Sequence, residues 1–519
     1  MKRIIYFIFC CLFLTLWSSC RKDFDFTPSN GTLTFSKDTV YLDTVFSNIG
    51  SSTYNLKVYN TSDNDIVIPS LKLALGEDSN YRLNVDGMSG KIFEDVEILA
   101  KDSMYIFIET TIDYNDFSNT ENTYLYTDEI QFDSGTNFQK VDLVTLVKDA
   151  VFIYPSKNDE GIVETLTLDI NGEQVETTIQ GRFLTENELH FTNTKPYVIY
   201  GYAAVPNNSI MTVDAGARLH FYTDSGLFVS EGASLQVNGT YSNDQDNLEN
   251  EVIFEGNRLE PSFSDIPGQW GTIWLYDGSI NNSINYATIK NATVAILSEG
   301  NPNENKLTLK NTQIYNSSNF GVLGRNTSIT AENIVINNSG QSSFSATLGG
   351  RYNVTHATIA NYWSSSFRQY PALLINNYLI DDENTTYLAD LSEANFNNCI
   401  IYGNDNPEFV LDEIEDDAVA FNFKFTNCLA RFQVSSSNNY TGNNYDFENT
   451  THYENMIFNE DPDFKNTANN ALIIGEDSKA INQGNTSFSN QVPLDLLNTN
   501  RTNSPDLGAY QHTIFEETE

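Results

Sequence analysis

The stretch LTLKNTQIYNSSN, residues 307–319, has an apolar pattern whose phase changes partway along. Leu307 and Leu309 alternate with polar residues as in a β-strand, but the next inward candidate, Ile314, falls at an odd spacing from Leu309. In an unbroken strand the side chains of one face stay two residues apart. The chain is therefore expected to turn a corner at Asn311, so that the strands on both sides of the corner face one interior.

A corner made by one residue needs an unusual, often left-handed backbone conformation, which Asn tolerates better than any residue except Gly. The same pattern, an apolar strand followed by a corner residue and an apolar residue three positions after it, recurs along the chain. Its corner positions are Tyr286, Asn311, Asn333, His356, Asn377, Asn398 and Asn427. The residues three positions later, in steps of 25, 22, 23, 21, 21 and 29, are Ile289, Ile314, Ile336, Ile359, Ile380, Ile401 and Ala430. A period of about 20 to 30 residues indicates a solenoid, and the corner side chains are expected to form a structural ladder from circuit to circuit.

This repeat resembles the right-handed parallel β-helix of the pectin-lyase-like superfamily, in which an Asn ladder occupies such a corner. The resemblance covers residues 195–510 and includes V-x-x-G-A-x-L at Val213 and Val229. It implies a β-helix over 195–480 and a terminal coil and cap over 481–519. The whole chain is therefore expected to be all-β.

Residues 31–150 carry short apolar runs of period two, separated by Asn, Asp, Ser and Gly. Many short strands with turn residues about every 8–12 positions are typical of a β-sandwich. The stretch VYNTSDNDIVI resembles the Ig-like modules of bacterial surface proteins. An Ig-like β-sandwich that acts as a spacer is therefore predicted here, and residues 151–194 are expected to form a connecting β segment.

The first residues of the chain indicate a targeting signal. Two basic residues precede an apolar run at 4–17, which is shorter than the roughly 20 residues of a membrane span. The run leads into LWSSC, which resembles a bacterial lipobox. The resemblance implies a signal peptide over 1–19, lipidation of Cys20 and a lipidated tether over 20–30. An uncleaved anchor helix is the alternative.

The residues after Cys20 indicate where a lipid would place the chain. Arg21 stands where an Asp would resemble an inner-membrane retention signal, and RKDFDF (21–26) resembles the surface-export signals of Bacteroidota lipoproteins. The resemblance implies a lipid-anchored protein of the outer membrane that is exposed on the cell surface. The membrane, contacted through the N-terminal lipid, is thus one expected partner.

The charge of the chain restricts its other partners. With 69 acidic and 28 basic residues, the formal net charge is −41. A surface this negative repels phosphate backbones, anionic lipid headgroups and polyuronates, so nucleic acid is excluded as an expected partner. The abundant Asn, Ser, Thr and Tyr residues instead favour neutral glycans, bound by hydrogen bonds and ring stacking.

Two cysteines occupy equivalent positions, because Cys399 and Cys428 each directly follow a corner residue. On neighbouring circuits their backbones would lie about 5 Å apart, within reach of a disulfide. A disulfide and a pair of buried stacked thiols therefore both remain open.

The catalytic signatures of polygalacturonase-like members are missing, because the sequence contains no N-T-D, G-H-G or R-I-K. The D-D pair at 381–382 is interpreted as a solvated turn. Three arginines are expected in the turns of successive circuits: Arg325, Arg351 and Arg368. If these arginines lay beside Asp381 or Glu383 in a cleft, they would indicate a lyase.

No catalytic residue, cofactor or metal site is assigned from the sequence. The acidic insertion 404–421 is a candidate for binding Ca²⁺ through several carboxylate oxygens, with a solvated loop as the alternative. His356 is expected to stack against Asn333 and Asn377 in the ladder rather than to act in catalysis.

These patterns favour a non-catalytic surface protein whose β-helix serves as a scaffold, a glycan-binding module or an adhesive module. The alternative is a polysaccharide-degrading enzyme, a lyase or a glycoside hydrolase of the pectin-lyase-like superfamily. The two classes differ in the site, because an enzyme brings two or three carboxylates, or a base and an arginine, into one groove.

Overall fold

The computed structural model describes residues 25–117, 122–170, 173–433, 440 and 442–515. Over these residues the chain is all-β, and the single α-helix among them is the four-residue α2 (Thr486–Ser489). No helix in this part of the chain has the length and apolar character needed to cross a bilayer. Cys20 and the signal predicted over 1–19 lie outside the described residues.

The chain divides into a small unit, Met1–Asp149, and a large unit, Ala150–Glu519. The small unit contains two β-sheets that share one hydrophobic core. Its strands alternate buried and part-exposed side chains, as in β11 (Gln139–Lys148), where Val141, Leu143 and Val147 are fully buried. One sheet contains β1 (Thr27–Pro28), β3 (Thr39–Phe46), β5 (Ile66–Leu73), β8 (Ile92–Ile98), β10 (Thr123–Phe132) and β11 (Gln139–Lys148). The other contains β2 (Thr34–Phe35), β4 (Tyr54–Tyr59), β6 (Tyr81–Val85), β7 (Met88–Gly90) and β9 (Ser103–Thr110).

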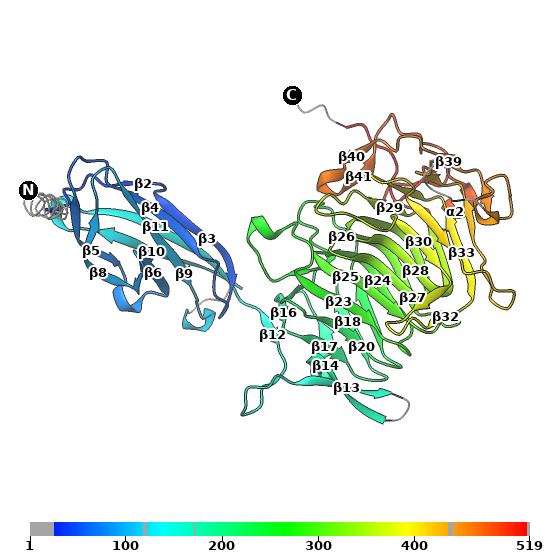
Figure 1. The fold of residues 1–519 in the computed structure, drawn as a ribbon, viewed down its shortest axis with the longest axis horizontal. Helices are drawn as coiled ribbons and strands as arrows, with labels where there is room; N and C mark the ends of the chain where they lie inside the picture. The colour runs from blue at the N-terminus through cyan, green and yellow to red at the C-terminus, as the bar shows by residue number, and fades with distance from the viewer. Residues whose placement is uncertain (1–24, 118–121, 171–172, 434–439, 441, 516–519) are drawn as a thin grey trace, which may run out of the picture. The chain divides into compact units, whose positions relative to one another are not determined.

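The large unit is dominated by one sheet of 26 strands (Figure 1). Its first half contains β12 (Val151–Ile153), β13 (Thr165–Ile170), β14 (Glu173–Phe183), β15 (His190–Phe191), β16 (Tyr197–Ile199), β17 (Tyr202–Val205), β18 (Ile210–Asp214), β19 (Arg218–Phe221), β20 (Gly226–Val229), β21 (Ser234–Asn238), β22 (Val252–Gly256), β23 (Trp270–Leu275) and β24 (Asn282–Lys290). Its second half contains β25 (Ala292–Glu299), β26 (Leu307–Ser317), β27 (Phe320–Ser339), β28 (Ser342–Thr355), β29 (Thr358–Asn361), β30 (Leu373–Asn376), β33 (Leu391–Asn397), β34 (Ile400–Gly403), β35 (Phe409–Asp412), β36 (Lys424–Thr426), β37 (Leu429–Ala430), β38 (Tyr453–Glu454) and β39 (Ile457–Phe458). Two hairpins stand outside it, β31 (Tyr378–Ile380) with β32 (Thr386–Leu388) and β40 (Phe464–Asn466) with β41 (Ala471–Ile474).

The strands of this sheet other than β13 form three faces, because each of them pairs in parallel with the corresponding strand of the next circuit. Face 1 begins with β15, β18 and β21. Face 2 begins with β12, β16, β19 and β22. Face 3 begins with β14, β17, β20 and β23. The longer strands β24, β26, β27 and β28 continue these faces and pass through the corners between them.

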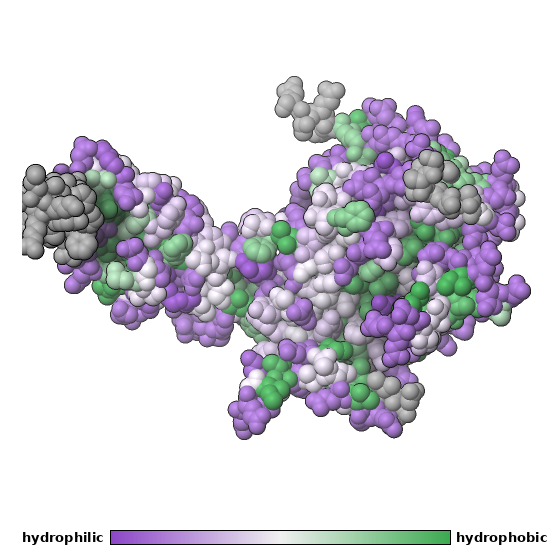
Figure 2. Space-filling model, viewed as in Figure 1, coloured by the Kyte–Doolittle hydropathy of each residue, from purple (hydrophilic) through white to green (hydrophobic). Residues whose placement is uncertain are grey.

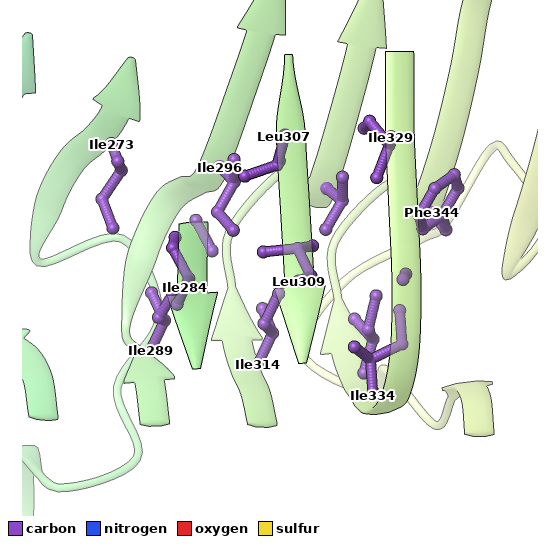
Figure 3. Close-up of a cluster of buried hydrophobic side chains, with 14 of the residues drawn as sticks. Ile273, Ile284, Ile289, Ile296, Leu307, Leu309, Ile314, Ile329, Ile334 and Phe344 are labelled. Atoms are coloured by element: carbon purple, nitrogen blue, oxygen red, sulfur yellow. The ribbon is translucent and has the colours of Figure 1, made fainter. Parts of the chain in front are cut away.

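The register places the inward side chains of successive circuits next to one another. On face 1, Ile284 pairs with Leu309, and on face 2, Ile289 pairs with Ile314. All four are fully buried, and Figure 3 shows them entering the same apolar interior. The change of phase at Asn311 is therefore a bend that keeps both strands facing one core, as the sequence predicts.

Aromatic side chains close the far end of this core. Phe425 and Tyr453 stack on the last circuits with ring centroids 5.8 Å apart, and Phe447 lies 4.9 Å from Tyr453. Tyr445, two residues before Phe447 in the sequence, adds another ring, which lies 5.5 Å from that of Phe432. These rings cover apolar side chains that no further circuit would protect from water.

Residues 151–194 do not form a separate connecting segment, which corrects the prediction. β12 pairs with β16, β14 with β17 and β15 with β18, all in parallel. These residues are therefore the first circuit of the large unit. The antiparallel hairpin of β13 and β14 interrupts the repeat within this circuit and hides it from a search for equal spacing.

Asn377 does not lie at the corner with the other ladder residues, which corrects the prediction that it belongs to the ladder. Ile359 pairs with Ile401. The corner residues that precede them, His356 and Asn398, are 42 residues apart, which is the length of one circuit here. The two apparent steps of 21 residues are therefore two parts of one circuit. Ile380 is 52% exposed in the hairpin β31–β32, and the preceding strand β30 belongs to face 3.

The C-terminal segment does not end the stack as a last coil, which corrects the cap predicted over 481–519. We call residues 471–512 the C-terminal strap. Leu507 of the strap packs with Ile400 and Leu429, while Tyr510 packs in a cluster with Val335. The strap therefore covers the apolar outward side of face 2 rather than the end of the core.

Candidate functional site

The corner side chains form a structural ladder along much of the stack. Asn311 and Asn333 have φ values of 48° and 52°. Asn311 Nδ2 donates to Asn285 Oδ1 at 3.0 Å, and Asn333 Nδ2 donates to Asn311 Oδ1 at 2.9 Å. The left-handed backbone and the chain of amide hydrogen bonds together explain why Asn stands at this corner.

His356 continues the corner, with φ of 54°, and is fully buried. Asn398 Nδ2 lies 3.0 Å from His356 Nε2, and His356 Nδ1 lies 3.2 Å from the backbone oxygen of Gly508. These partners correct the expectation that His356 stacks against Asn333 and Asn377. Burial is the main cause that lowers the pKa of His356 well below its usual 6.5, so the neutral imidazole serves the architecture.

Two other predicted ladder residues, Asn427 and Asn377, differ in their hydrogen-bond partners. Asn427, with φ of 51°, accepts a hydrogen bond from Asn455 Nδ2 at 3.3 Å and donates to Gln483 O at 2.7 Å. Asn377 donates to the backbone oxygen of Ile414 at 2.9 Å and accepts from the Ile414 N–H at 3.0 Å. Asn377 therefore holds the acidic insertion against the stack and lies outside the ladder.

A second row of asparagines was missed by the sequence analysis. Asn291, Asn316 and Asn338 have φ values of 66°, 56° and 58°. Asn338 Nδ2 donates to Asn316 Oδ1 at 2.7 Å, and Asn316 Nδ2 lies 3.5 Å from Asn291 Oδ1. The signal was present in the sequence, because each of these residues follows a first corner residue by five positions.

Cys399 and Cys428 are free and fully buried thiols. Cys399 Sγ donates to Asn397 O at 3.2 Å, and Cys428 Sγ donates to Phe396 O at 3.3 Å. Burial, and then the neighbouring Cys399, raise the pKa of Cys428 well above its usual 9.0. The pair fills the core as stacked thiols and presents no nucleophile to a ligand.

The D-D pair lies in the turn of the hairpin β31–β32. Asp381 accepts hydrogen bonds from the backbone N–H groups of Glu383 and Thr385 at 3.0 and 2.8 Å. These bonds lower the pKa of the Asp381 carboxyl. The arrangement is that of a turn, as predicted, and gives Asp381 a local structural role.

The three candidate arginines each have a structural partner. Arg325 pairs with Glu299 at 3.0 Å. Arg368 forms a buried bidentate pair with Glu408, at 2.7 and 2.8 Å. Arg351 donates to Ser328 Oγ at 3.1 Å. Within the part of the chain that the structure describes, none of the three pairs with Asp381 or Glu383, so the lyase arrangement is not assembled.

The acidic insertion 404–421 contains β35 and the loop that follows it. A hollow beside this loop is lined by several of its carboxylates together with Tyr440 and Tyr445. Over the described ranges, no group of three or more His, Cys, Asp or Glu side chains is arranged to hold a metal ion. The candidate Ca²⁺ ligands are therefore placed near one another without forming a coordination cage.

An aromatic cleft of about 960 Å³ lies at the beginning of the large unit, where the first circuits meet the hairpin β13–β14. This volume is at the upper end of the roughly 300–1,000 Å³ typical of ligand pockets. Its aromatic lining residues are Tyr154, Tyr200, Tyr202, Tyr222 and Trp274. On the face of the large unit seen in Figure 2, the surface is mostly hydrophilic and its hydrophobic residues lie in small separate groups. The cleft is therefore the strongest candidate for a ligand site.

One side of the cleft is a row of tyrosines. Tyr154, Tyr200 and Tyr222 directly follow β12, β16 and β19, which pair in parallel on successive circuits. The rings of Tyr200 and Tyr222 lie 4.7 Å apart with planes 27° from parallel. Tyr154 is 61% exposed and Tyr222 47% exposed, so the row presents aromatic surface to solvent.

Tyr202 lies across two glycines of the neighbouring strands. A Cβ atom on Gly226 would come within 2.7 Å of Tyr202 Cε1, and one on Gly271 within 2.6 Å of the Tyr202 hydroxyl. Only glycine leaves room for the ring in this position. Burial, with a smaller effect of Asp224, raises the pKa of Tyr202 to about 12, so its hydroxyl remains a proton donor at neutral pH.

Trp274 is oriented by a hydrogen bond at the rim of the cleft. Its indole Nε1 donates to Glu299 Oε2 at 2.6 Å, and the other oxygen of Glu299 accepts from Arg325 Nη1 at 3.0 Å. The backbone of Tyr154 is also held, because Arg182 Nε donates to its carbonyl oxygen at 3.1 Å. The aromatic surfaces are therefore held in place before any ligand arrives.

Polar groups complete the lining. Thr178, Gln180, Thr223 and Asp224 reach the cleft from the hairpin and from the turn after β19. Among the described residues, the hydroxyls of the four lining tyrosines have no hydrogen-bond partner within the protein. Those hydroxyls are consequently free to bind the hydroxyl groups of a ligand.

This cleft was not expected from the sequence, although its tyrosine row carries a signal there. The stretches VFIY (151–154), YVIY (197–200) and LHFY (219–222) each place a tyrosine after a short apolar strand. Their unequal spacing hid the equivalence, because the hairpin β13–β14 separates the first from the second.

Comparison with known proteins assigns no family to the chain. No protein-family model and no curated protein matches it. Among solved structures, a PapD-like domain of human CEP192 is similar at 11% identity and a TM-score of 0.15, covering 26% of this chain and 94% of that domain. The E. coli chaperone DraB is similar at 11% identity and a TM-score of 0.16, covering 29% and 80%. A family 123 glycoside hydrolase from Clostridium perfringens is similar at 8% identity and a TM-score of 0.16, covering 24% and 30%. At such low TM-scores none of the three carries a fold or a function over to this chain.

Proposed function

We propose that the large unit is a right-handed parallel β-helix resembling the pectin-lyase-like superfamily, and that it binds glycans without cleaving them. The pairing of strands on three faces and the Asn ladder at one corner support this fold. The two sheets with a shared core support an Ig-like β-sandwich for the small unit. The small unit then serves as a spacer between the membrane and the glycan-binding unit.

The observation that carries glycan binding is the aromatic cleft. Aromatic rings pack against the C–H faces of sugar rings, while nearby hydroxyl, amide and carboxylate groups bind sugar hydroxyls. The lining offers both, with Tyr222 and Trp274 among the rings and Gln180 and Asp224 among the polar groups. A scaffold or adhesive role requires none of these features to converge, so the cleft favours binding.

The cleft also argues against the alternative of a glycoside hydrolase. Most such enzymes use two carboxyl groups on either side of the scissile bond. The lining contains a single carboxylate, that of Asp224. Arg325 pairs with Glu299, the residue that also holds Trp274, and Arg368 pairs with Glu408, so each of these guanidinium groups already has a carboxylate partner.

A glycan array combined with a reducing-sugar release assay tests this function. The wild-type protein is expected to bind a subset of glycans and to release no reducing ends from them. Tyr222→Ala is expected to weaken the binding, whereas Tyr41→Ala, a matched control at a 65% exposed tyrosine of the small unit, is expected to leave it unchanged. Release of reducing sugar by the wild type would favour the enzyme instead.

The proposed location is the outer membrane, with the lipid on Cys20 as the anchor and the cell surface as the exposed side. The lipobox-like LWSSC and the following RKDFDF support this proposal. Metabolic labelling with a radioactive fatty acid tests it. Label is expected in the wild type and is expected to be absent from Cys20→Ala, and an unlabelled wild type would contradict lipid anchoring.

A further inference from the structure

The lining of the aromatic cleft carries no net charge, in contrast to the chain as a whole. Its charged side chains are Asp224 and Lys157, one of each sign, while the chain has a formal net charge of −41. A cation site would gather several carboxylates, and a site for uronic acids would present arginines or lysines in excess. Resting on the proposed glycan-binding function, we infer that this cleft takes an uncharged oligosaccharide segment.

The charge of the whole protein acts in the same direction. A net charge of −41 raises the energy of any polyanion that approaches, and salt screens that repulsion at separations beyond a Debye length of about 8–10 Å at 0.1–0.15 M. An uncharged ligand experiences no such repulsion. Its affinity is therefore independent of ionic strength, whereas any binding of an acidic glycan strengthens as salt is added.

The contacts within the cleft fit the two kinds of surface on a neutral sugar. Tyr202, seated over its two glycines, and Trp274, held by Glu299, offer fixed aromatic faces for the C–H side of a ring. Asp224 and Gln180 supply an acceptor and an amide for the hydroxyls on its edge. Because these groups are already in place, the site loses little conformational freedom on binding.

The size of the cleft indicates more than a single sugar. At about 960 Å³ it fills the upper end of the range for small-molecule pockets. Tyr154, Tyr200 and Tyr222 extend its aromatic side over three successive circuits. A segment of several sugar units, rather than a monosaccharide, matches this length.

Calorimetric titration of the purified full chain distinguishes the ligand classes. The probes are neutral hexasaccharides of glucose, mannose and xylose and a galacturonic acid hexasaccharide, each at low and at high salt. We expect at least one neutral probe to bind with a dissociation constant that is the same at both salt concentrations. We expect Tyr222→Ala to raise this constant roughly 3- to 10-fold. Tyr222→Phe, which keeps the ring, should raise it less, and Tyr41→Ala should leave it unchanged.

Three results would overturn the inference in distinguishable ways. If the acidic hexasaccharide binds more tightly than every neutral probe and Tyr222→Ala weakens it, the cleft binds glycans but the uncharged class is wrong. If a neutral probe binds equally well to Tyr222→Ala and Trp274→Ala, with both variants shown to be folded by circular dichroism, the site lies elsewhere. If no glycan of either kind binds the wild type, the proposed function itself fails.

Discussion

Arg501 Nη2 donates to Asn333 Oδ1 at 3.0 Å, although the two residues are 168 positions apart in the chain. Asn333 thus joins the corner ladder, through Asn311 Oδ1, to the C-terminal strap. The same arrangement recurs along the corner, where Asn398 Nδ2 donates to Asn485 O at 3.0 Å. The corner residues therefore have two tasks, since they connect successive circuits and fasten the strap that covers face 2.

Two substitutions of Asn333 distinguish how much its left-handed backbone and how much its side-chain hydrogen bonds contribute to the free energy of unfolding. Asn333→Ala loses the bonds to Asn311 and Arg501 and strains a residue with φ of 52°, which together cost about 2–4 kcal/mol of unfolding free energy. Asn333→Gly keeps the backbone relaxed and should lose about 1 kcal/mol less. Equilibrium denaturation measures both variants.

The matched control is Asn384→Ala, at an exposed turn residue with φ of 61° outside the ladder. It should cost only the backbone strain of about 1–2 kcal/mol. Equal losses for Asn333→Ala and Asn384→Ala would mean that the ladder bonds contribute nothing.

Lys306 makes stability depend on pH in the neutral to alkaline range. Its side chain is fully buried, and Nζ donates to Tyr276 O at 2.5 Å. Burial, partly offset by Asp277 and Glu299, lowers its pKa from 10.5 to about 7. Between these values the unfolded chain binds the proton and the folded chain does not, so stability rises with pH by up to about 5 kcal/mol.

Lys306→Met removes this ionisable group while keeping a long apolar side chain. The variant is expected to be more stable than the wild type at pH 7 and to lose the rise between pH 7 and 10. Thermal melts across this pH range provide the measurement. An unchanged pH profile in the variant would show that another group causes the dependence.

His356 makes stability depend on pH on the acid side. Its pKa in the folded protein is well below the usual 6.5, mainly because of burial. As pH falls below 6.5, the unfolded chain takes up a proton that the folded chain resists, so stability falls. His356→Asn is expected to reduce this loss, because an amide can take part in the ladder without binding a proton.

The control for this prediction is His512→Asn, whose histidine pairs with Asp506 in the strap. That variant keeps His356 and should therefore keep its contribution to the acid-side loss. Urea denaturation at a series of pH values between 4 and 7 compares the two. The prediction is wrong if His356→Asn and the wild type lose stability in parallel.

Glu299 acts on the cleft only by positioning Trp274. Glu299→Ala removes the acceptor of the indole N–H, so the ring should become mobile and ligand affinity should fall roughly 2- to 10-fold. Acrylamide quenching of tryptophan fluorescence should increase in the same variant. Glu332→Ala, which removes a surface pair with Lys310, is the control and should change neither quantity.

The sequence predicted the corner at Asn311 and Asn333 because a phase change in an apolar pattern is a local signal. It failed at Asn377, where a strand of face 3 followed by a hairpin repeats the same apolar spacing. Only the pairing of distant strands distinguishes the two cases. The aromatic cleft was hidden for the same reason: the tyrosine after each short apolar strand is a local signal, but Tyr154 and Tyr200 become neighbours only when the hairpin β13–β14 folds out of the first circuit.

A crystal structure of the protein grown with a neutral oligosaccharide tests the central claim most directly. Our account predicts sugar rings lying on Tyr202 and Trp274, with their hydroxyls bound by Asp224 and Gln180. Sugar bound at another surface while the aromatic cleft contains only solvent would contradict it.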